Sequence, residues 1–138
     1  MMNQEIKAKW VNALRSGDYE QGQGALKNPD GQYCCLGVLC DLYDKHRMEE
    51  FAAESSWAVD TVSLNEYISV LGDRSEVGVP PNAVVDWAGL SDNNPDILVD
   101  LEDEIGEEKY QYELAIAELN DDKGLTFNEL ADLIEEQL

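Results

Sequence analysis

Hydrophobic residues recur every three or four positions near the beginning of the chain, which is the spacing of one helical face. Asn3 stands before this pattern, where its side chain can cap a helix, and Gly17 follows it, where a helix can stop. The pattern therefore predicts a helix that runs from Asn3 to about Ser16. Its expected buried face consists of Ile6, Trp10, Val11 and Leu14.

Beyond Gly17 the pattern predicts two short strands and then a buried helix. Residues 28–31 read Asn-Pro-Asp-Gly, with proline at the second turn position and glycine at the fourth, so we expect a hairpin with strands at about 20–26 and 32–35. The next segment, from Cys35 to Asp44, is almost entirely apolar at helical spacing and predicts a buried helix. Gly37 within it indicates close backbone packing.

The middle of the chain predicts short elements. Residues 47–56 suit an acidic loop or a short helix, whereas residues 57–64 mix β-branched and aromatic side chains and favour a strand. Two prolines make residues 77–81 extended, and Pro81 suits the first turn of a short helix that runs through Trp87 and ends at Gly89. Residues 91–95 have turn chemistry, and residues 97–101 fit either a short strand or the start of a helix.

Two helices are expected to complete the chain. Residues 107–120 place Tyr110, Leu114 and Ala117 on one side, with acidic residues in the first turn. After a turn at residues 120–124, Thr126 and Glu129 form a capping box for a last helix. Its expected core stripe is Phe127, Leu130, Ile134 and Leu138. The patterns together predict a single domain over residues 1–138 of the α+β class, mostly helical with a small antiparallel sheet.

The chain of 138 residues is strongly acidic, with 30 Asp and Glu against nine Lys and Arg and a net charge of -21. Residues 1–50 account for only -2 of this charge, so the acids lie in the last two thirds. Such a chain lacks the basic stripe that binding to a phosphate backbone requires, which argues against direct nucleic-acid binding and leaves imitation of nucleic acid open. The sequence shows no membrane-spanning apolar run and no signal peptide, so we expect a soluble, cytoplasmic protein.

No set of residues predicts catalysis or a metal site. There are three cysteines, Cys34, Cys35 and Cys40, and an odd number argues against structural disulfides. Their spacing with His46 is not that of a zinc site. We therefore expect three reduced thiols buried as small hydrophobic groups. His46 is expected at the surface near a helix end, and residues 119–130 fail three ligand positions of a calcium loop. We therefore expect no cofactor, no metal ion and no enzymatic activity.

Several segments resemble a family of small uncharacterised proteins from tailed bacteriophages and prophages. The most specific segment is residues 33–42, which read Tyr-Cys-Cys-Leu-Gly-Val-Leu-Cys-Asp-Leu. The others are Lys9-Trp10-Val11, Ala13 to Gly17, Gln21-Gly22 with Leu26, Leu119-Asn120-Asp121, Phe127, Ala131-Asp132 and Ile134-Glu135, although Leu130 stands where isoleucine is usual. The resemblance covers about residues 3–42 and 114–138. It implies a phage origin, hence the cytoplasm of an infected bacterium, and no agreed activity.

Three hypotheses follow from such an origin. In the first, the chain is a counter-defence protein whose family segments surround a pocket, and oligomers of it sequester a small host immune signal, for example a nucleotide-derived one. In the second, the acidic face imitates nucleic acid and blocks a host DNA- or RNA-binding protein. In the third, the chain is a structural or assembly accessory. The family segments lie mostly outside the acidic part, which favours the pocket.

The pocket hypothesis names candidate ligand-binding residues. Hydrogen bonds could come from Gln21, Gln23, Tyr33, Asn120 and Asp121, a stacking surface from Trp10 or Trp87, and contacts to an anionic group from Lys9, Arg15 or Lys27. The alternative for Trp10 is core packing, and the two glutamines could be solvent-facing strand positions. The expected partners are a small molecule or a host protein, without membrane contact and with self-association into a homo-oligomer.

Overall fold

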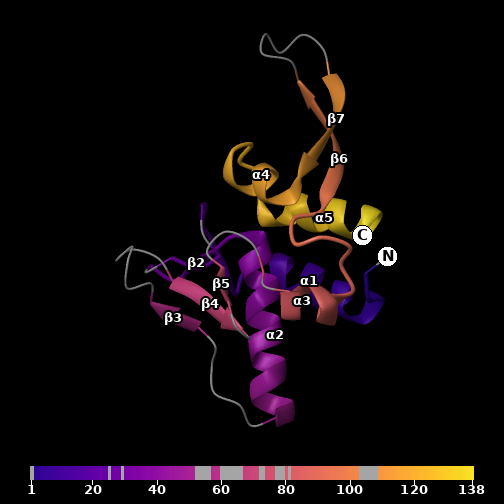
Figure 1. The fold of residues 1–138 in the computed structure, drawn as a ribbon. Coiled ribbons are helices and arrows are strands. Elements are labelled where there is room, and N and C mark those ends of the chain that lie inside the picture. Colours follow the sequence, from indigo (N-terminus) through magenta and orange to yellow (C-terminus); the bar gives the residue numbers. More distant parts are fainter. Residues whose placement is uncertain are drawn as a thin grey trace.

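The computed structural model describes residues 2–24, 26–28, 30–51, 57–59, 67–71, 74–76, 80, 82–102 and 109–138. The helices are α1 (Gln4–Ser16), α2 (Cys35–Phe51), α3 (Asn82–Ala88), α4 (Ile116–Asp121) and α5 (Phe127–Gln137). The strands are β1 (Glu20–Gln21), β2 (Gln32–Tyr33), β3 (Trp57–Val59), β4 (Tyr67–Leu71), β5 (Arg74–Glu76), β6 (Asp96–Glu102) and β7 (Lys109–Ala115). The predicted α+β class, with more helix than strand, is confirmed (Figure 1).

The first helix has the predicted ends and the predicted buried face. The Asn3 side chain accepts hydrogen bonds from the backbone N–H of Glu5 and of Ile6, at 3.0 and 3.1 Å. Gly17 ends α1 in the left-handed conformation, with φ at 80°. The hydrophobic stripe, consisting of Ile6, Trp10, Val11 and Leu14, is buried in the core. The local signals at both ends of α1 were therefore sufficient to place it.

The predicted hairpin over residues 20–35 is wrong in its pairing. β1 and β2 run parallel, with Glu20 opposite Gln32 and Gln21 opposite Tyr33. The turn at residues 28–31 does form, since the Gly31 N–H donates to the Asn28 carbonyl at 3.0 Å, and Lys27 forms an antiparallel bridge to Tyr33. Among the described residues, the strand predicted over 20–26 is present at Glu20–Gln21, and the antiparallel bridge to β2 comes from Lys27.

Helix α2 begins where predicted but continues to Phe51, beyond the apolar run that ended at Asp44. Its later turns carry oppositely charged side chains at helical spacing. Lys45 lies 3.3 Å from Asp41, and Arg47 lies 3.8 Å from Asp44. Such pairs stabilise a helix beyond the reach of its buried face. The segment predicted as an acidic loop or short helix is therefore helical to Phe51, and residues 52–56 lie outside the described residues.

Gly37 permits the backbones of α2 and of the preceding segment to touch. A Cβ atom at this position would lie 1.8 Å from the carbonyl oxygen of Leu26, far inside any van der Waals contact. Leu26 is itself fully buried. The close packing that the sequence predicted at Gly37 is thus confirmed, and it fixes Leu26 against the first turn of α2.

The predicted middle segments form where they are described, and two further strands, β4 and β5, were not predicted. β3 forms at the beginning of the predicted 57–64 strand and pairs with β4, which pairs in turn with β5. α3 ends as expected, with Gly89 at a φ of 72°. The predictions for residues 60–64, 77–79 and 81 lie outside the described residues. Of the helices in the described part, none is both long and apolar enough to cross a membrane.

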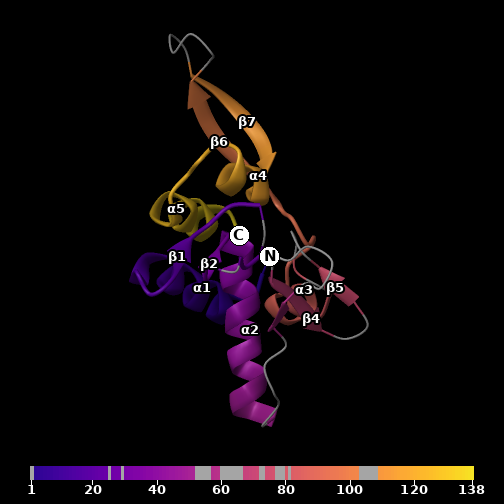
Figure 2. The same cartoon turned by 90° about the vertical axis from the view of Figure 1, so that its left-hand side faces the viewer.

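The helix predicted over residues 107–120 is mostly a strand. Residues 109–115 form β7, which pairs antiparallel with β6, and only α4 is helical. The segment alternates polar and hydrophobic residues with period two as well as placing some at helical spacing. The segment forms a strand because it pairs with β6, whose Ile97 is buried in the core. The β6–β7 hairpin projects away from the helices in both views (Figures 1 and 2). Residues 107–108 lie outside the described residues.

The last helix packs on the first. Thr126 and Glu129 form the predicted capping box, and Phe127, Leu130 and Ile134 are buried as expected, while Leu138 is partly buried against the core. At the surface between α1 and α5, Arg15 lies 2.5 Å from Asp132 and 2.8 Å from Glu135. The two ends of the chain thereby share one core.

The contact at Gly37 predicts a large cost for the smallest possible side chain. Gly37→Ala should lower the free energy of unfolding by about 3 kcal/mol or more, because the methyl group meets backbone that cannot move aside without unpacking α2. The measurement is chemical denaturation followed by circular dichroism. Gly17→Ala is the matched control: no atom lies within 4 Å of its added Cβ, so only the strain of a positive φ remains, about 1 kcal/mol. Equal losses in both variants would contradict the contact.

Candidate functional site

A buried amide, that of Asn120, joins three segments that are distant in the sequence. The Asn120 side chain is fully buried, and its Nδ2 donates to the Gly22 carbonyl at 3.0 Å and to Asp121 Oδ1 at 2.7 Å. Its Oδ1 accepts from Gln21 Nε2 at 2.9 Å and from the Cys35 N–H at 3.3 Å. Both donors and both acceptor sites of the amide are therefore used inside the protein.

Gln21 extends this network to the connection between α4 and α5. Its Nε2 also donates to the Leu125 carbonyl at 2.8 Å, and its Oε1 accepts from the Phe127 N–H at 3.1 Å. Gln23 makes a longer contact, from Nε2 to the Asn120 carbonyl at 3.4 Å. Four of the predicted site residues, Gln21, Gln23, Asn120 and Asp121, are thus brought together. The polar atoms of Gln21 and Asn120 bond to other parts of the chain and thereby hold these segments together.

A cavity of about 310 Å³ opens on the outer side of this network. It is lined by Gln21, Gly22, Gln23, Gln32, Gly124 and Leu125, and we call it the amide cavity. Gln32 enters it as a half-buried side chain whose Nε2 donates to Glu20 and whose Oε1 accepts from Asn28. Gln23 is exposed. The amide cavity offers amide and backbone hydrogen-bonding groups, and its lining contains no nucleophile, imidazole or base.

Three other candidate residues lie elsewhere and have structural partners. Trp10 is fully buried, and its indole Nε1 donates to the Cys35 carbonyl at 2.9 Å, so core packing is the correct interpretation. Arg15, on α1, forms ion pairs with Asp132 and Glu135 of α5. Trp87 packs edge-on against Tyr43, with ring centroids 5.2 Å apart, and does not line the amide cavity.

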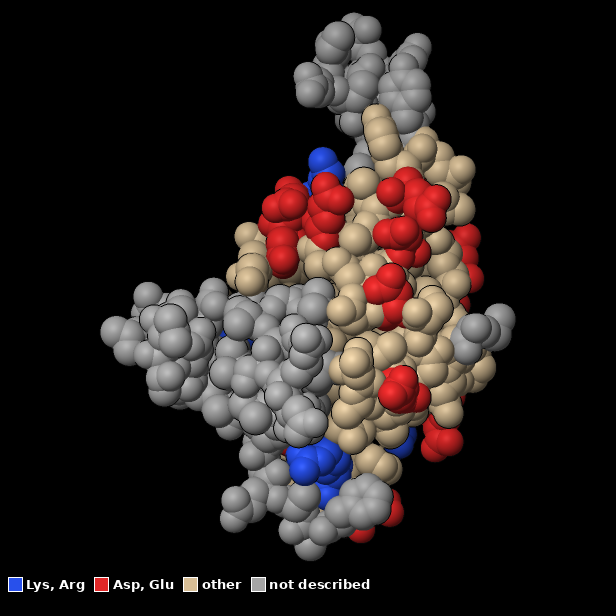
Figure 3. All heavy atoms as spheres, in the orientation of Figure 1, with Lys and Arg blue, Asp and Glu red and all other residues tan. Residues whose placement is uncertain are grey.

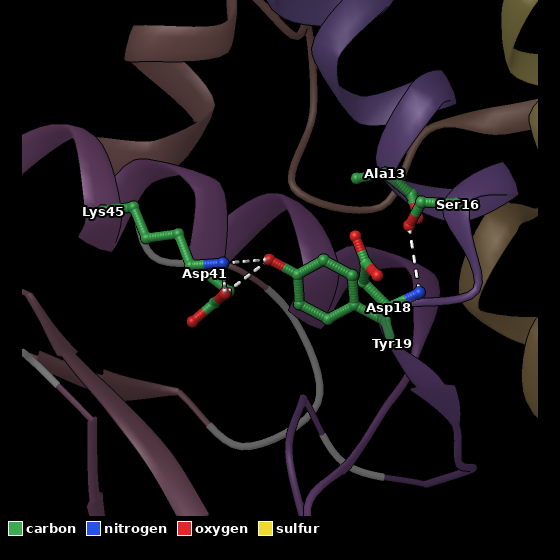
Figure 4. A network of polar contacts seen from close by, with 6 residues as sticks. All are labelled: Ala13, Ser16, Asp18, Tyr19, Asp41 and Lys45. Carbon is green, nitrogen blue, oxygen red and sulfur yellow. Dashed lines mark hydrogen bonds and ion pairs between the residues drawn. The ribbon is translucent and has the colours of Figure 1, made fainter.

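Tyr33 and Lys27, two further candidates, belong to a second cluster that the sequence did not predict, whereas Lys9 is exposed on α1. The Tyr33 ring meets the Tyr19 ring edge-on at 5.0 Å, and the Lys27 ammonium lies 5.3 Å from the Tyr33 centroid. The Tyr19 hydroxyl donates to Asp41 Oδ2 at 2.5 Å and accepts from Lys45 Nζ at 3.0 Å (Figure 4). The spacing of Asp41 and Lys45 on one helix was the available signal. Nothing in the sequence indicated that Tyr19 meets them.

Burial shifts the ionisation of the groups in this cluster. Burial, with the hydrogen bond to Asp41, raises the pKa of Tyr19 to about 12, and burial raises the pKa of Tyr33 to about 12. The hydrogen bond with Tyr19 raises the pKa of Lys45. At neutral pH both phenols are therefore protonated, and the hydrogen bonds of the Tyr19 hydroxyl to Asp41 and Lys45 hold Tyr19 on α2.

The three cysteines are buried and free, as small hydrophobic groups in the core. Burial raises the pKa of Cys34 to about 12 and raises those of Cys35 and Cys40 well above the ordinary range. Because the thiolate is the reactive form, these thiols are inert at neutral pH. His46 lies five residues before the end of α2, partly buried and with its ring 5.5 Å from that of Trp87.

The fold and this site define a small α+β protein with a preformed polar cavity. The chain belongs to the family described as a domain of unknown function, DUF8296, whose model matches residues 2–138. No curated protein and no solved structure matches it. The family therefore extends over nearly the whole chain, including the middle that the sequence resemblance left unmatched.

The Asn120 network predicts that an isosteric change at this position destabilises the fold. Asn120→Asp keeps the shape but removes both N–H donors and places a carboxylate in a fully buried position. The free energy of unfolding should fall by about 3 kcal/mol in thermal or chemical denaturation at neutral pH. Gln23→Ala is the control, since its exposed side chain makes only a long contact, and its effect should stay within about 0.5 kcal/mol. A loss as small as this in Asn120→Asp would show that the amide is dispensable.

The Tyr19 cluster predicts loss of stability in alkaline solution. Since the raised pKa favours the protonated phenol in the folded state, its contribution is complete below pH 10 and is lost as the pH rises to about 12. In Tyr19→Phe the unfolding free energy should fall less steeply over this range, and about 1 kcal/mol should be lost at neutral pH with the hydroxyl hydrogen bonds. Denaturation at several pH values measures both. An unchanged slope would mean that Tyr19 ionises equally in the folded and unfolded chain.

Proposed function

We propose that this protein acts by binding a small polar ligand in the amide cavity. The observation that carries the proposal is the state of the two amides behind the cavity. Gln21 and Asn120 are held by internal hydrogen bonds, so the wall is formed before any ligand arrives. A preformed site binds with less loss of conformational freedom than one that must be ordered.

The chemistry of the lining favours an uncharged, hydrogen-bonding ligand group. Amides and backbone groups match the donor and acceptor edge of a nucleobase or a similar heterocycle. None of the lining residues is basic, and Gln32 is bonded to the Glu20 carboxylate, which repels anions. A nucleotide-derived ligand would therefore place its base in the cavity and its phosphates in solvent.

The biological role follows from the resemblance to phage proteins. A phage protein that binds such a ligand without a catalytic group in the lining would sequester it, and a nucleotide-derived immune signal of the infected host is the ligand class we propose. This role requires the cytoplasm of the host and gains avidity if the protein self-associates. It requires no cofactor.

A second candidate function is imitation of nucleic acid by the acidic surface. Acidic side chains gather over α4 and the β6–β7 hairpin on the face drawn in Figure 3, with few basic atoms among them. This arrangement would attract a basic host protein. Its binding would depend on salt, unlike that of an uncharged group in the amide cavity.

The two functions differ in the variants that abolish binding. Protein incubated in a bacterial host extract and then denatured should release a small molecule detectable by mass spectrometry. Gln23→Trp, which fills the amide cavity, and Gln32→Ala should reduce the amount at least tenfold, as expected for a lost buried contact of about 1–3 kcal/mol. Changing Asp96, Glu113, Glu118 and Asp122, which lie on β6, β7, α4 and at the end of α4, to Lys is the control and should leave the amount unchanged.

The opposite result would support imitation of nucleic acid. In that case both cavity variants still bind a basic host protein. The four charge reversals abolish this binding, and added salt weakens it. Melting curves of each variant confirm that it is folded before binding is compared.

A further inference from the structure

The outer edge of β6 already pairs with a group that imitates a neighbouring strand. The side-chain amide of Gln137, at the end of α5, meets the backbone of Leu98. Its Oε1 accepts from the Leu98 N–H at 2.8 Å, and its Nε2 donates to the Leu98 carbonyl at 2.7 Å. These are the two hydrogen bonds that one residue of an added antiparallel strand would make.

The same edge continues beyond Gln137. In an antiparallel ladder, alternate residues direct their N–H and C=O groups to the partner strand and to the free edge. Because those of Leu98 turn away from β7, those of Asp100 and Glu102 turn away too. In the described part of the chain β6 pairs only with β7, so this stretch of edge has no strand beside it.

A groove runs along this edge, between β6 and α5. It has a volume of about 300 Å³, and its lining is Leu98, Val99, Asp100, Gln111, Leu133, Glu136 and Gln137. Leu98 is 46% exposed, so its side chain is open to solvent in this groove. Apolar side chains from both walls thus stand beside two carboxylates.

The charge of the groove selects its occupant. Asp100 and Glu136 line it, Asp96 lies on the same strand, and no basic residue is among the lining residues. A second copy of this chain would place its own acids against these, and like charges across a strand pair are destabilising. An extended segment that carries Lys or Arg is attracted instead.

We propose that the free edge of β6 binds an extended basic segment of a partner protein as an added strand. Side chains alternate across a sheet, so the basic residues of the segment lie on the face of Asp100 and the residues between them on the face of Val99. Backbone hydrogen bonds supply the pairing, and the carboxylates supply the preference for a cationic sequence. None of the groove residues lines the amide cavity, so this inference stands apart from the proposed function.

A short synthetic peptide tests the proposal directly. The probe is an end-blocked, fluorescent peptide of sequence Lys-Val-Lys-Val-Lys, and fluorescence anisotropy with the full chain should show saturable binding. The double variant Asp100→Lys with Glu136→Lys should weaken it at least tenfold. The matched control is Glu49→Lys with Glu50→Lys, on the exposed end of α2, which changes the net charge equally and should bind as the unmodified chain does.

Backbone pairing is tested by peptides methylated on alternate amide nitrogens. One series carries the methyl groups on the lysine amides and the other on the valine amides. An added strand turns only one set of N–H groups toward β6, so one series should lose binding and the other should keep it. Equal binding by both series would show that the contact is charge attraction alone and would overturn the proposal. The proposal would also be overturned if the unmethylated peptide did not bind, or if the double charge reversal left its affinity unchanged. Circular dichroism establishes that each variant is folded.

Discussion

The buried amide of Asn120 is the constraint on which the arrangement of this chain depends. A polar group in a fully buried position costs free energy unless it is hydrogen-bonded, and Asn120 meets this condition only with the loop after β1, the first turn of α2 and its own neighbour in place together. Gln21 then ties the same point to the beginning of α5. Segments 100 residues apart are therefore ordered by one set of bonds, and the amide cavity is the outer surface of that set.

This arrangement gives a physical reason for several residues that stood out in the sequence. Trp10 bonds the carbonyl of Cys35, Gly37 admits the backbone of Leu26, and the buried cysteines fill the space around them. These residues build the core. The proposed ligand is left with the groups of the rim, chiefly the exposed Gln23 and the half-buried Gln32. A binding test must therefore separate variants of the rim from variants of the core.

The helices with caps at their ends were predictable, and the long-range contacts were not. Asn3 and Gly17 mark α1, and Thr126 with Glu129 marks α5, because a helix end is a local property of four or five residues. The sequence of β7 fits both the helical spacing and the alternation of a strand. Its pairing with β6, which is a long-range contact, determines that it is a strand. The bond from Gln21 to Asn120 and the contact of Tyr19 with Asp41 join distant segments, so no local pattern contains them. The sequence predicted Gln21 and Asn120 as candidate ligand-binding residues but could not show that their side chains bond each other.

A double-mutant cycle between Gln21 and Asn120 tests the central claim most directly. The free energy of unfolding is measured for the unmodified chain, for Gln21→Ala, for Asn120→Ala and for the double variant. If the two amides form one network, the double variant should lose less than the two single variants together, with a coupling of about 1 kcal/mol or more. Losses that add to within about 0.3–0.5 kcal/mol would show two independent sites and would contradict the account.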